Sequence, residues 1–448
     1  MYPFFYKKLI FPVYHYLKRD NVMKLLKELR ETQWKSLDEI HNIQRIKLKK
    51  LLIYAYKNVP YYRRFIGKNK LLPDTLGKYD NFRKLPILSK DIIRENMDEL
   101  VSTNLSGNRL YKNSTSGSTG DNLFFYTDKR SIIHRKALKI VNQEWMDFHL
   151  GERTVSLWGA PMDLSKARSL RGRIHGFVTK NLLLSSYDLS PEIMDMYIRH
   201  IKKFKPKLFV SYPGPLEVFA GYIKEEGISF PTIKSIITSA EQLFNHQRTL
   251  FEDVFKAEVF NRYGCREVGD IAQECSHHCG LHVNANRVFV EILDDYDNPA
   301  PPGVIGELYI TDLDNYGMPM IRYQIGDRAS WSEKIECSCG RGFPILAEIE
   351  GRSMDVIKTP SNKKLGGTFW TILLKTRPGI KQFQILQEDI NGIIIYYLPD
   401  KTFDKQSLKY FEQKIKKKCG DDFNVTFIQK DKISKTTSGK NRFIISKC

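Results

Sequence analysis

The 448-residue chain lacks any apolar run long enough to cross a membrane. Its clean apolar stretch near the start, 9–14, is too short for a signal-peptide core, and no small-residue cleavage site follows. Internal repeats, low-complexity segments and a recognised nucleic-acid-binding module are also missing. We therefore expect a cytoplasmic globular protein of two or three domains with no nucleic-acid partner.

Cysteine is sparse, with seven in the chain, and four of the seven form two close pairs. These pairs are Cys275 with Cys279 and Cys337 with Cys339. In a large chain without a signal peptide, paired cysteines indicate metal binding rather than disulfides. With His282 they make five candidate ligands for Zn²⁺, which takes four thiolates or imidazoles. The alternative is a set of buried, inert cysteines.

Positive charge is abundant and lies at the two ends of the chain. The formal net charge is +20, and residues 1–70 carry 17 Lys and Arg against 5 Asp and Glu. Residues 353–448 carry 19 against 9. Such ends are either ordinary solvated surface or an attraction to phosphates, as in an anionic substrate, a nucleotide or a membrane surface.

A stretch rich in hydroxyls and glycine, Ser-Thr-Ser-Gly-Ser-Thr-Gly at 114–120, stands between two strand-like segments. Such a loop offers backbone N–H groups and hydroxyls to an anion, and glycine lets the backbone approach a triphosphate closely. No Gly-Lys-Ser/Thr follows, so it is not a Walker loop. The alternative is a flexible surface linker.

Helical and strand patterns alternate through the first 351 residues, which predicts an α/β fold with mostly parallel strands. Residues 1–70 form a basic helical segment, and 288–311 belong to a small β subdomain. The strand pattern around a basic helix in 352–448 predicts a small, mobile α+β C-terminal domain. The extreme N-terminus either packs on the body of the protein or lies on a membrane as an amphipathic segment.

Several short motifs follow the hydroxyl-rich loop in a fixed order: Ser239-Ala240-Glu241, Tyr263-Gly264-Cys265-Arg266-Glu267, Arg322-Tyr323-Gln324-Ile325-Gly326-Asp327, Gly351-Arg352 and Ser438-Gly439-Lys440. In this order they resemble the adenylate-forming superfamily of acyl-CoA synthetases, peptide-synthetase adenylation domains and luciferases. The two cysteine segments are similar to those of its phenylacetate-CoA ligase branch, and within it of the capsule-biosynthesis CapK-type group.

The resemblance implies that a carboxylate attacks the α-phosphate of ATP and that an amine or CoA then displaces AMP. In that reaction Lys440 neutralises charge on the α-phosphate and Glu267 ligates Mg²⁺. Asp327 binds the ribose hydroxyls, and Tyr263 packs on adenine. The implied nucleotide site also contains Ser114, Thr115, Ser116, Gly117, Ser118, Thr119, Gly120, Ser239, Ala240, Glu241, Gly264, Arg266 and Arg352.

The branch resemblance also selects Cys275, His282, Cys337 and Cys339 as the ligands of a structural Zn²⁺, with Cys279 or His278 as substitutes. Three departures from the family pattern stand out. The phosphate loop ends in Asp121-Asn122 without the usual lysine, Arg266 replaces a Ser or Thr, and Met354 replaces the hinge aspartate.

The implied partners are a carboxylic acid and an amine or CoA acceptor. An amine acceptor fits amide formation on a sugar acid in surface-polysaccharide assembly, with peripheral contact to the inner face of the membrane or to a lipid-linked glycan. An aryl-CoA ligase is the alternative. A nucleotide- or glycan-binding protein without catalysis is a third hypothesis, favoured by the departures and opposed by the retained Glu267, Asp327 and Lys440.

Overall fold

The computed structural model divides the chain into two units. One consists of Met1–Ile325 with Ser330–Glu348, and the other of Gly326–Ala329 with Ile349–Cys448. The residues that the structure describes are 2–69, 79–105, 110–115, 123–159, 170–186, 189–352, 357–361, 364–365, 370, 373–374, 379–400, 402–433 and 444–448.

The first unit begins with helices, as the basic N-terminal pattern predicts. Ser36 starts the longest of them: its side chain accepts a hydrogen bond from the Glu39 amide, and the Glu39 carboxylate accepts one from the Ser36 amide. Ser89 caps a later helix through the Ile92 amide. These helices are α1 (Tyr2–Phe5), the π-helix η1 (Tyr6–Ile10), α2 (Phe11–Leu17), α3 (Val22–Thr32), α4 (Leu37–Asn58), α5 (Pro60–Lys68), α6 (Tyr79–Phe82), α7 (Lys90–Glu95) and α8 (Met97–Leu100).

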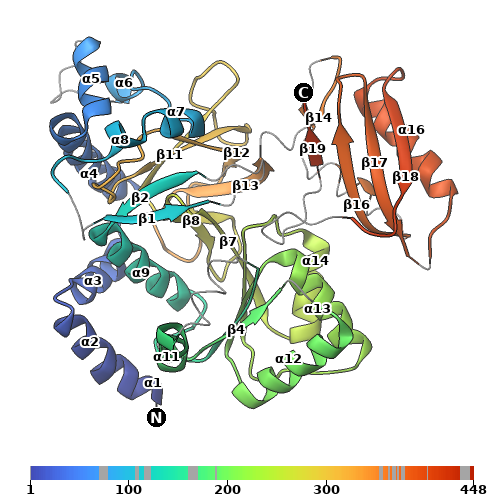
Figure 1. The fold of residues 1–448 in the computed structure, drawn as a ribbon, viewed down its shortest axis with the longest axis horizontal. Coiled ribbons are helices and arrows are strands. Elements are labelled where there is room, and N and C mark those ends of the chain that lie inside the picture. The colour runs from blue at the N-terminus through green and yellow to red at the C-terminus, as the bar shows by residue number, and fades with distance from the viewer. Residues whose placement is uncertain are drawn as a thin grey trace. The chain divides into compact units, whose positions relative to one another are not determined.

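A sheet of eleven strands crosses the first unit (Figure 1). Its spatial order is β10 (Val288–Leu293), β11 (Gly306–Asp312), β12 (Tyr323–Trp331), β13 (Ile345–Arg352), β9 (Leu281–Val283), β8 (Gly269–Glu274), β7 (Glu258–Cys265), β6 (Ser235–Ser239), β5 (Leu208–Ser211), β3 (Thr154–Trp158) and β4 (Asn181–Ser185). The strands from β4 to β7 are parallel, and β7, β8, β9 and β13 pair antiparallel. The predicted α/β class is confirmed. The strands expected as a β subdomain, β10 and β11, are an antiparallel pair of this same sheet.

Helices cover the parallel part of this sheet. Their apolar faces pack on the strands in one core that includes Phe209, Phe219, Ile236 and Phe251. Figure 1 shows α12, α13 and α14 side by side against these strands. The helices of this region are α9 (Lys129–Glu144), α11 (Leu170–Thr179), α12 (Pro191–Phe204), α13 (Pro213–Glu225) and α14 (Asn245–Phe255).

Two antiparallel strands, β1 (Leu110–Ser114) and β2 (Phe124–Asp128), form a separate hairpin. Thr115 closes it, because its amide donates to the Leu123 carbonyl and its hydroxyl accepts from the Leu123 amide. The chain that joins the two strands is the hydroxyl-rich stretch, and its residues 116–122 lie outside the described part. Asp128 then caps α9 through the Ser131 amide, which fixes the hairpin to that helix.

The second unit is an α+β fold around a four-stranded sheet with the order β18-β17-β16-β19. The apolar side of α16, with Phe411 and Ile415, packs on Ile385 and Ile395 of the sheet. The elements are β14 (Ile357–Lys358), β15 (Lys364–Leu365), β16 (Ile380–Gln387), β17 (Gly392–Pro399), α16 (Gln406–Cys419), β18 (Asn424–Gln429) and β19 (Ile444–Ser446). Across the described residues, no helix is both long and apolar enough to cross a membrane.

Candidate functional site

The parallel strands end at one edge of the sheet, where polar and aromatic residues gather. Strand register places Trp158 of β3 level with Ser185 and places Ser239 of β6 level with Arg262 of β7. The Trp158 ring lies against the ring of Tyr212, which follows β5, with centroids 4.2 Å apart. In open α/β sheets, ligands bind outside the carboxyl ends of the parallel strands. This edge is therefore the candidate ligand site.

The predicted triplet Ser239-Ala240-Glu241 forms the turn at the end of β6. Ala240 has a φ of +69°, a left-handed conformation that is uncommon for a residue with a side chain. The turn directs Glu241 to the start of α13, where its Oε2 accepts a hydrogen bond from the Gly214 amide at 2.9 Å. A bond from a carboxylate to a helix N-terminus is favourable because of the helix dipole. The triplet is thereby held at the ligand edge.

Tyr263 and Gly264 lie at the end of β7, beside the tight turn to β8. The register of the two strands shifts between these residues. A Cβ on Gly264 would lie 2.4 Å from the Gly269 carbonyl oxygen, so only glycine fits. The sequence motif around Gly264 thus has a steric cause. The turn that follows carries Arg266 and Glu267.

Glu267, the predicted Mg²⁺ ligand, is a buried carboxylate held from two sides. The Tyr323 hydroxyl donates to its Oε1 at 2.8 Å. The guanidinium of Arg135 donates to the Glu267 carbonyl at 2.6 Å and to the Arg266 carbonyl at 3.1 Å. These bonds fix both the main chain and the side chain of the turn, which is the rigidity that a metal or phosphate ligand requires.

Arg135 is itself fixed by a buried charge network. Its guanidinium lies 3.5 Å from Asp312, which also pairs with the fully buried Arg287 at 2.6 Å. Burial, together with the nearby Arg287 charge, lowers the pKa of Arg135. Gly269 leaves space for the arginine stem, because a Cβ there would lie 3.2 Å from the Arg135 Cδ. Arg135 carries no motif in the sequence, and only the fold brings it to the turn of Glu267.

A cavity of about 370 Å³ lies beside the β1–β2 hairpin, and we call it the hairpin cavity. It lies at the base of the hydroxyl-rich loop, and three cations face it with no carboxylate among the residues that line it. A cavity of this composition suits an anion such as phosphate. Its lining consists of Tyr111, Lys112, Asn113, Phe125, Thr127, Ile132, Arg135 and Arg266.

The structure describes only part of the predicted nucleotide site. Ser114 ends β1 and Thr115 closes the hairpin, whereas Ser116, Gly117, Ser118, Thr119 and Gly120 lie outside the described residues. Lys440 also lies outside them. Asp327 lies on β12 within the segment that belongs to the second unit, and Arg352 is the last residue of β13. The roles of these residues stay predictions.

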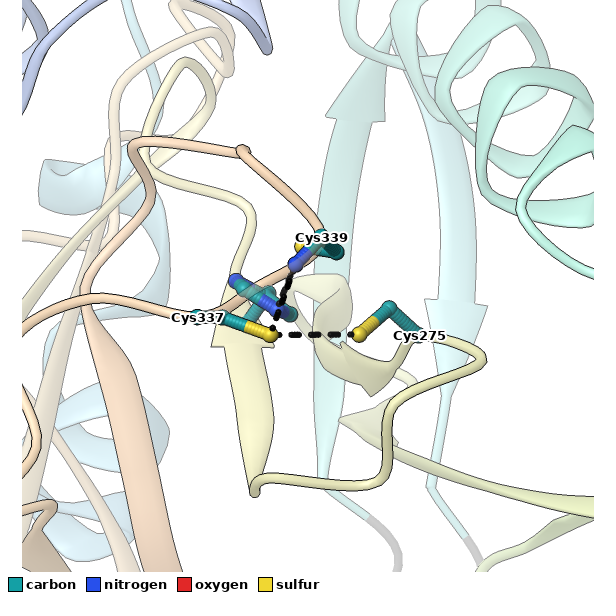
Figure 2. Close-up of side chains that lie close together, drawn as sticks. Cys275, Cys337 and Cys339 are labelled. Carbon is teal, nitrogen blue, oxygen red and sulfur yellow. Dashed lines mark hydrogen bonds between the residues drawn. The ribbon is translucent and has the colours of Figure 1, made fainter.

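A second cluster gathers cysteine and histidine side chains from three loops and strands. The ligand atoms of Cys275, His282, Cys337 and Cys339 all lie within 4.8 Å of one another. The sulfur atoms of Cys275 and Cys337 are 3.7 Å apart and face each other in Figure 2, and the Cys339 sulfur is 3.5 Å from the His282 Nε2. Three thiols and one imidazole at this spacing suit a tetrahedral metal such as Zn²⁺.

The electrostatics of this cluster favour a neutral imidazole. Burial, together with the nearby Arg341 charge, lowers the pKa of His282 to about 4. A neutral ring nitrogen is the form that binds metal. His278, the predicted substitute, instead contacts Glu258 at 2.9 Å and Glu274 at 3.3 Å. Among the described residues, neither His278 nor Cys279 belongs to the group of four.

Aromatic side chains enclose the cluster. The Trp145 ring meets the His282 ring edge to face, and the Arg341 guanidinium lies between the rings of Trp34 and Trp145 at 4.9 and 4.7 Å. Gln33 accepts hydrogen bonds from both the Trp145 indole and Arg341. The four-residue cluster therefore ties strand β9 and the 337–343 segment to α9 and the end of α3. A closed, buried arrangement of this kind is typical of a structural metal site.

Comparison with known proteins agrees with this architecture. Residues 358–447 match the model of the CapK C-terminal domain family. Protein CapK of Staphylococcus aureus is 27% identical over 440 residues, covering 96% of this chain and 92% of its own. A phenylacetate-coenzyme A ligase of Thermus thermophilus is 21% identical over 335 residues, covering 71% of this chain and 72% of its own.

Among solved structures, 2-hydroxyisobutyryl-CoA ligase in its postadenylation state superimposes with a TM-score of 0.72 at 18% identity, over 90% of this chain and 88% of that one. The fold is thus that of the adenylate-forming ligases. The chain is similar to the phenylacetate-coenzyme A ligases, and its likeness to protein CapK extends over nearly its whole length. The resemblance predicted from the motifs is confirmed.

Proposed function

We propose that this chain is an ATP-dependent, AMP-forming carboxylate ligase. It joins a carboxylate to the α-phosphate of ATP with release of diphosphate, and it then passes the acyl group to an amine or a thiol. The observation that carries this proposal is the hairpin cavity, whose cations lie at the base of the hydroxyl-rich loop and next to the buried Glu267 turn. The likeness to adenylate-forming ligases supports the same reaction.

In this proposal the 114–120 loop and the cavity cations bind the β- and γ-phosphates, because phosphoryl transfer depends mainly on position and charge. Tyr263 packs on adenine, the 239–241 turn lines its pocket and Asp327 binds the ribose. Glu267 fits Mg²⁺, since it is a hard carboxylate ligand already oriented by Tyr323, and the ion would neutralise phosphate charge. Lys440 stabilises the charge that develops on the α-phosphate and carboxylate.

The same proposal assigns a structural Zn²⁺ to Cys275, His282, Cys337 and Cys339. The support is the donor set itself, with four atoms within 4.8 Å and a histidine kept neutral by burial. A catalytic role does not fit, because three of the four residues are almost fully buried.

The acceptor is proposed to be an amine, so that the product is an amide on a sugar acid in surface-polysaccharide assembly. The likeness to CapK-type proteins and the basic ends of the chain, which suit a phosphorylated or lipid-linked sugar at the inner membrane face, favour this choice. CoA is the alternative acceptor, since the phenylacetate-coenzyme A ligases among the relatives carry it in their name.

A protein that binds nucleotide or glycan without catalysis is the candidate from another class. The specific observation in its favour is Asp121-Asn122 where the family has a loop lysine. This hypothesis predicts that ATP binds without diphosphate release. The next measurement distinguishes it from the ligase hypothesis.

The test is diphosphate release from ATP and Mg²⁺ in the presence of separate aryl, amino and uronic acids. We expect release with one acid class, followed by AMP release when the matching amine or CoA is added. If no acid causes diphosphate release while ATP still binds, the ligase proposal is overturned in favour of the binding protein. Release that requires CoA and no amine would replace the amide product with a thioester.

Replacing Arg135 with glutamine is expected to weaken ATP binding about tenfold or more. The substitution removes one cation of the hairpin cavity and both hydrogen bonds to the Glu267 turn, and charge-assisted bonds of this kind contribute roughly 1.5–3 kcal/mol each. Isothermal titration with ATP and Mg²⁺ measures the effect without knowledge of the acid substrate.

Arg130→Gln is the matched control for Arg135→Gln. Arg130 lies on the same helix and is paired with Asp314, but its side chain is 58% exposed and outside the cavity. Asp314 is buried but keeps its pairs with Lys47 and His134 when Arg130 is replaced, so ATP affinity should stay within about twofold. Equal losses in the two variants would contradict a specific role for Arg135.

A further inference from the structure

The N-terminal segment is apolar on two opposite sides. Toward the protein, Tyr6 and Phe11 are buried in one core with residues of α3 and α9, as predicted for packing on the body. Away from it stand exposed apolar side chains that we call the outer face. Their exposed fractions are 64% for Phe4, 50% for Phe5, 59% for Leu9, 47% for Val13, 82% for Tyr16 and 73% for Leu17.

Polar contacts fix this segment in place, so the outer face is held toward solvent. The buried His15 ring lies 2.7 Å from Asp20 and its Nε2 lies 2.9 Å from the Lys136 Nζ on α9. The Tyr2 hydroxyl donates to the Val178 carbonyl at 2.6 Å. A soluble surface rarely exposes a contiguous set of large apolar side chains unless something binds there.

Helix α11 lies beside the start of the N-terminal segment and exposes further apolar side chains. Ile174 and Phe177 are 56% and 73% exposed. The Lys180 Nζ lies 4.2 Å from the Phe177 ring centroid and 4.3 Å from that of Tyr2, so one lysine bridges α11 and the start of the N-terminal segment. Lys7, Lys8, Lys18 and Arg19 are exposed on the same segment.

A cavity of about 410 Å³ opens beside the start of this segment, and we call it the basic cavity. Lys207 is paired there with Glu152 at 3.0 Å, while Arg153, Lys180 and Lys205 add three further positive charges. An anion of the size of a phosphate headgroup fits this charge. The lining residues are Tyr2, Pro3, Gly151, Glu152, Arg153, Lys180, Lys205 and Lys207.

We propose that the outer face, α11 and the basic cavity together dock the protein on an anionic lipid bilayer. The aromatic and aliphatic side chains enter the headgroup layer, and the lysines contact lipid phosphates, as in interfacial amphipathic helices. A second copy of the chain is a poorer occupant, because each copy would bring the same basic segment to the contact. The inference deepens the peripheral membrane contact of the proposed function.

The test is co-sedimentation of the full chain with vesicles of phosphatidylglycerol and phosphatidylcholine against vesicles of phosphatidylcholine alone. We expect binding to the anionic vesicles that weakens in high salt. Replacing Phe4, Leu9 and Leu17 together with asparagine should reduce binding at least tenfold. Replacing Lys180 and Lys205 with glutamine should reduce binding by about 25-fold, because each charge contributes about fivefold.

Tyr296→Asn with Ile335→Asn is the matched control, because these side chains are 85% and 69% exposed but outside the docking surface. The control should bind vesicles as the parent does, and thermal unfolding should match in all variants. Equal binding to neutral vesicles, full binding by the triple variant, or binding of soluble glycerol phosphate without vesicle binding would each overturn the proposal. Because no acid or ATP is needed, the result is independent of the ligase assay.

Discussion

Replacing Lys440 with alanine is expected to lower diphosphate release at least about 10²–10³-fold while ATP still binds. Removal of one preorganised donor from a developing charge has an effect of this size. The cations of the hairpin cavity belong to the first unit and are untouched, so ATP affinity should change by less than about fivefold. Release is measured with the acid that the substrate panel identifies, and ATP affinity by titration.

Lys432→Ala is the control for Lys440→Ala, since Lys432 is an exposed lysine eight positions before Lys440. Strand β19 follows Lys440 in the chain and pairs with β16, so the thermal unfolding of both variants also reports whether the second unit stays folded. Unchanged diphosphate release in Lys440→Ala would contradict the assigned role. If neither the parent nor the variants release diphosphate, the result would favour the binding protein instead.

The sequence predicted the fold class and most of its elements because their signals are local. Strand β3 at Thr154–Trp158 and strand β10 at Val288–Leu293 each coincide with a short stretch rich in apolar and β-branched residues. The helix expected at 405–418 lies at Gln406–Cys419. The Ser-Gly-rich loop was predictable as the link between two strands, and the described ends of that hairpin agree.

The long-range contacts could not be predicted from the sequence. Arg135 lies in mid-helix with no motif, and it reaches the Glu267 turn only because α9 packs beside β8. Tyr323 was visible in a motif, but its bond to Glu267 links residues 56 positions apart. The sequence showed no simple amphipathic pattern that would predict the outer face. Both sides of the N-terminal segment are apolar, and only the packing in the structure distinguishes them.

The metal cluster shows what topology adds to spacing. Four candidate ligands are close together in the sequence, so spacing alone left several ligand sets open. They are Cys275, His278, Cys279 and His282. The antiparallel pairing of β9 with β13 places His282 opposite Ile345, next to the segment that carries Cys337. That pairing favours His282 as a ligand, and the ring of His278 instead contacts Glu258 and Glu274.

Cys337→Ser is therefore expected to lose bound zinc and to lower the midpoint of thermal unfolding by about 5–10 °C. A metal present at a thousand times its dissociation constant stabilises the folded state by about 4 kcal/mol, and each kcal/mol corresponds to roughly 2–4 °C in smaller domains than this one. The loss of stability should extend beyond the four residues, because the cluster also holds Arg341 between Trp34 and Trp145. Elemental analysis and calorimetry of the purified protein measure the two effects.

Cys279→Ser distinguishes this ligand set from the alternative that spacing allowed. Cys279 contacts Cys337 but lies outside the group of four whose ligand atoms are within 4.8 Å of one another, so this variant should keep about one zinc per chain and the parent midpoint. A strong chelator should bring the parent and Cys279→Ser down to the midpoint of Cys337→Ser, and should change Cys337→Ser little. If Cys279→Ser loses the metal and Cys275→Ser retains it, the assignment of Cys275 is wrong. If the parent holds no zinc and the chelator shifts no midpoint, the cysteines are inert core residues.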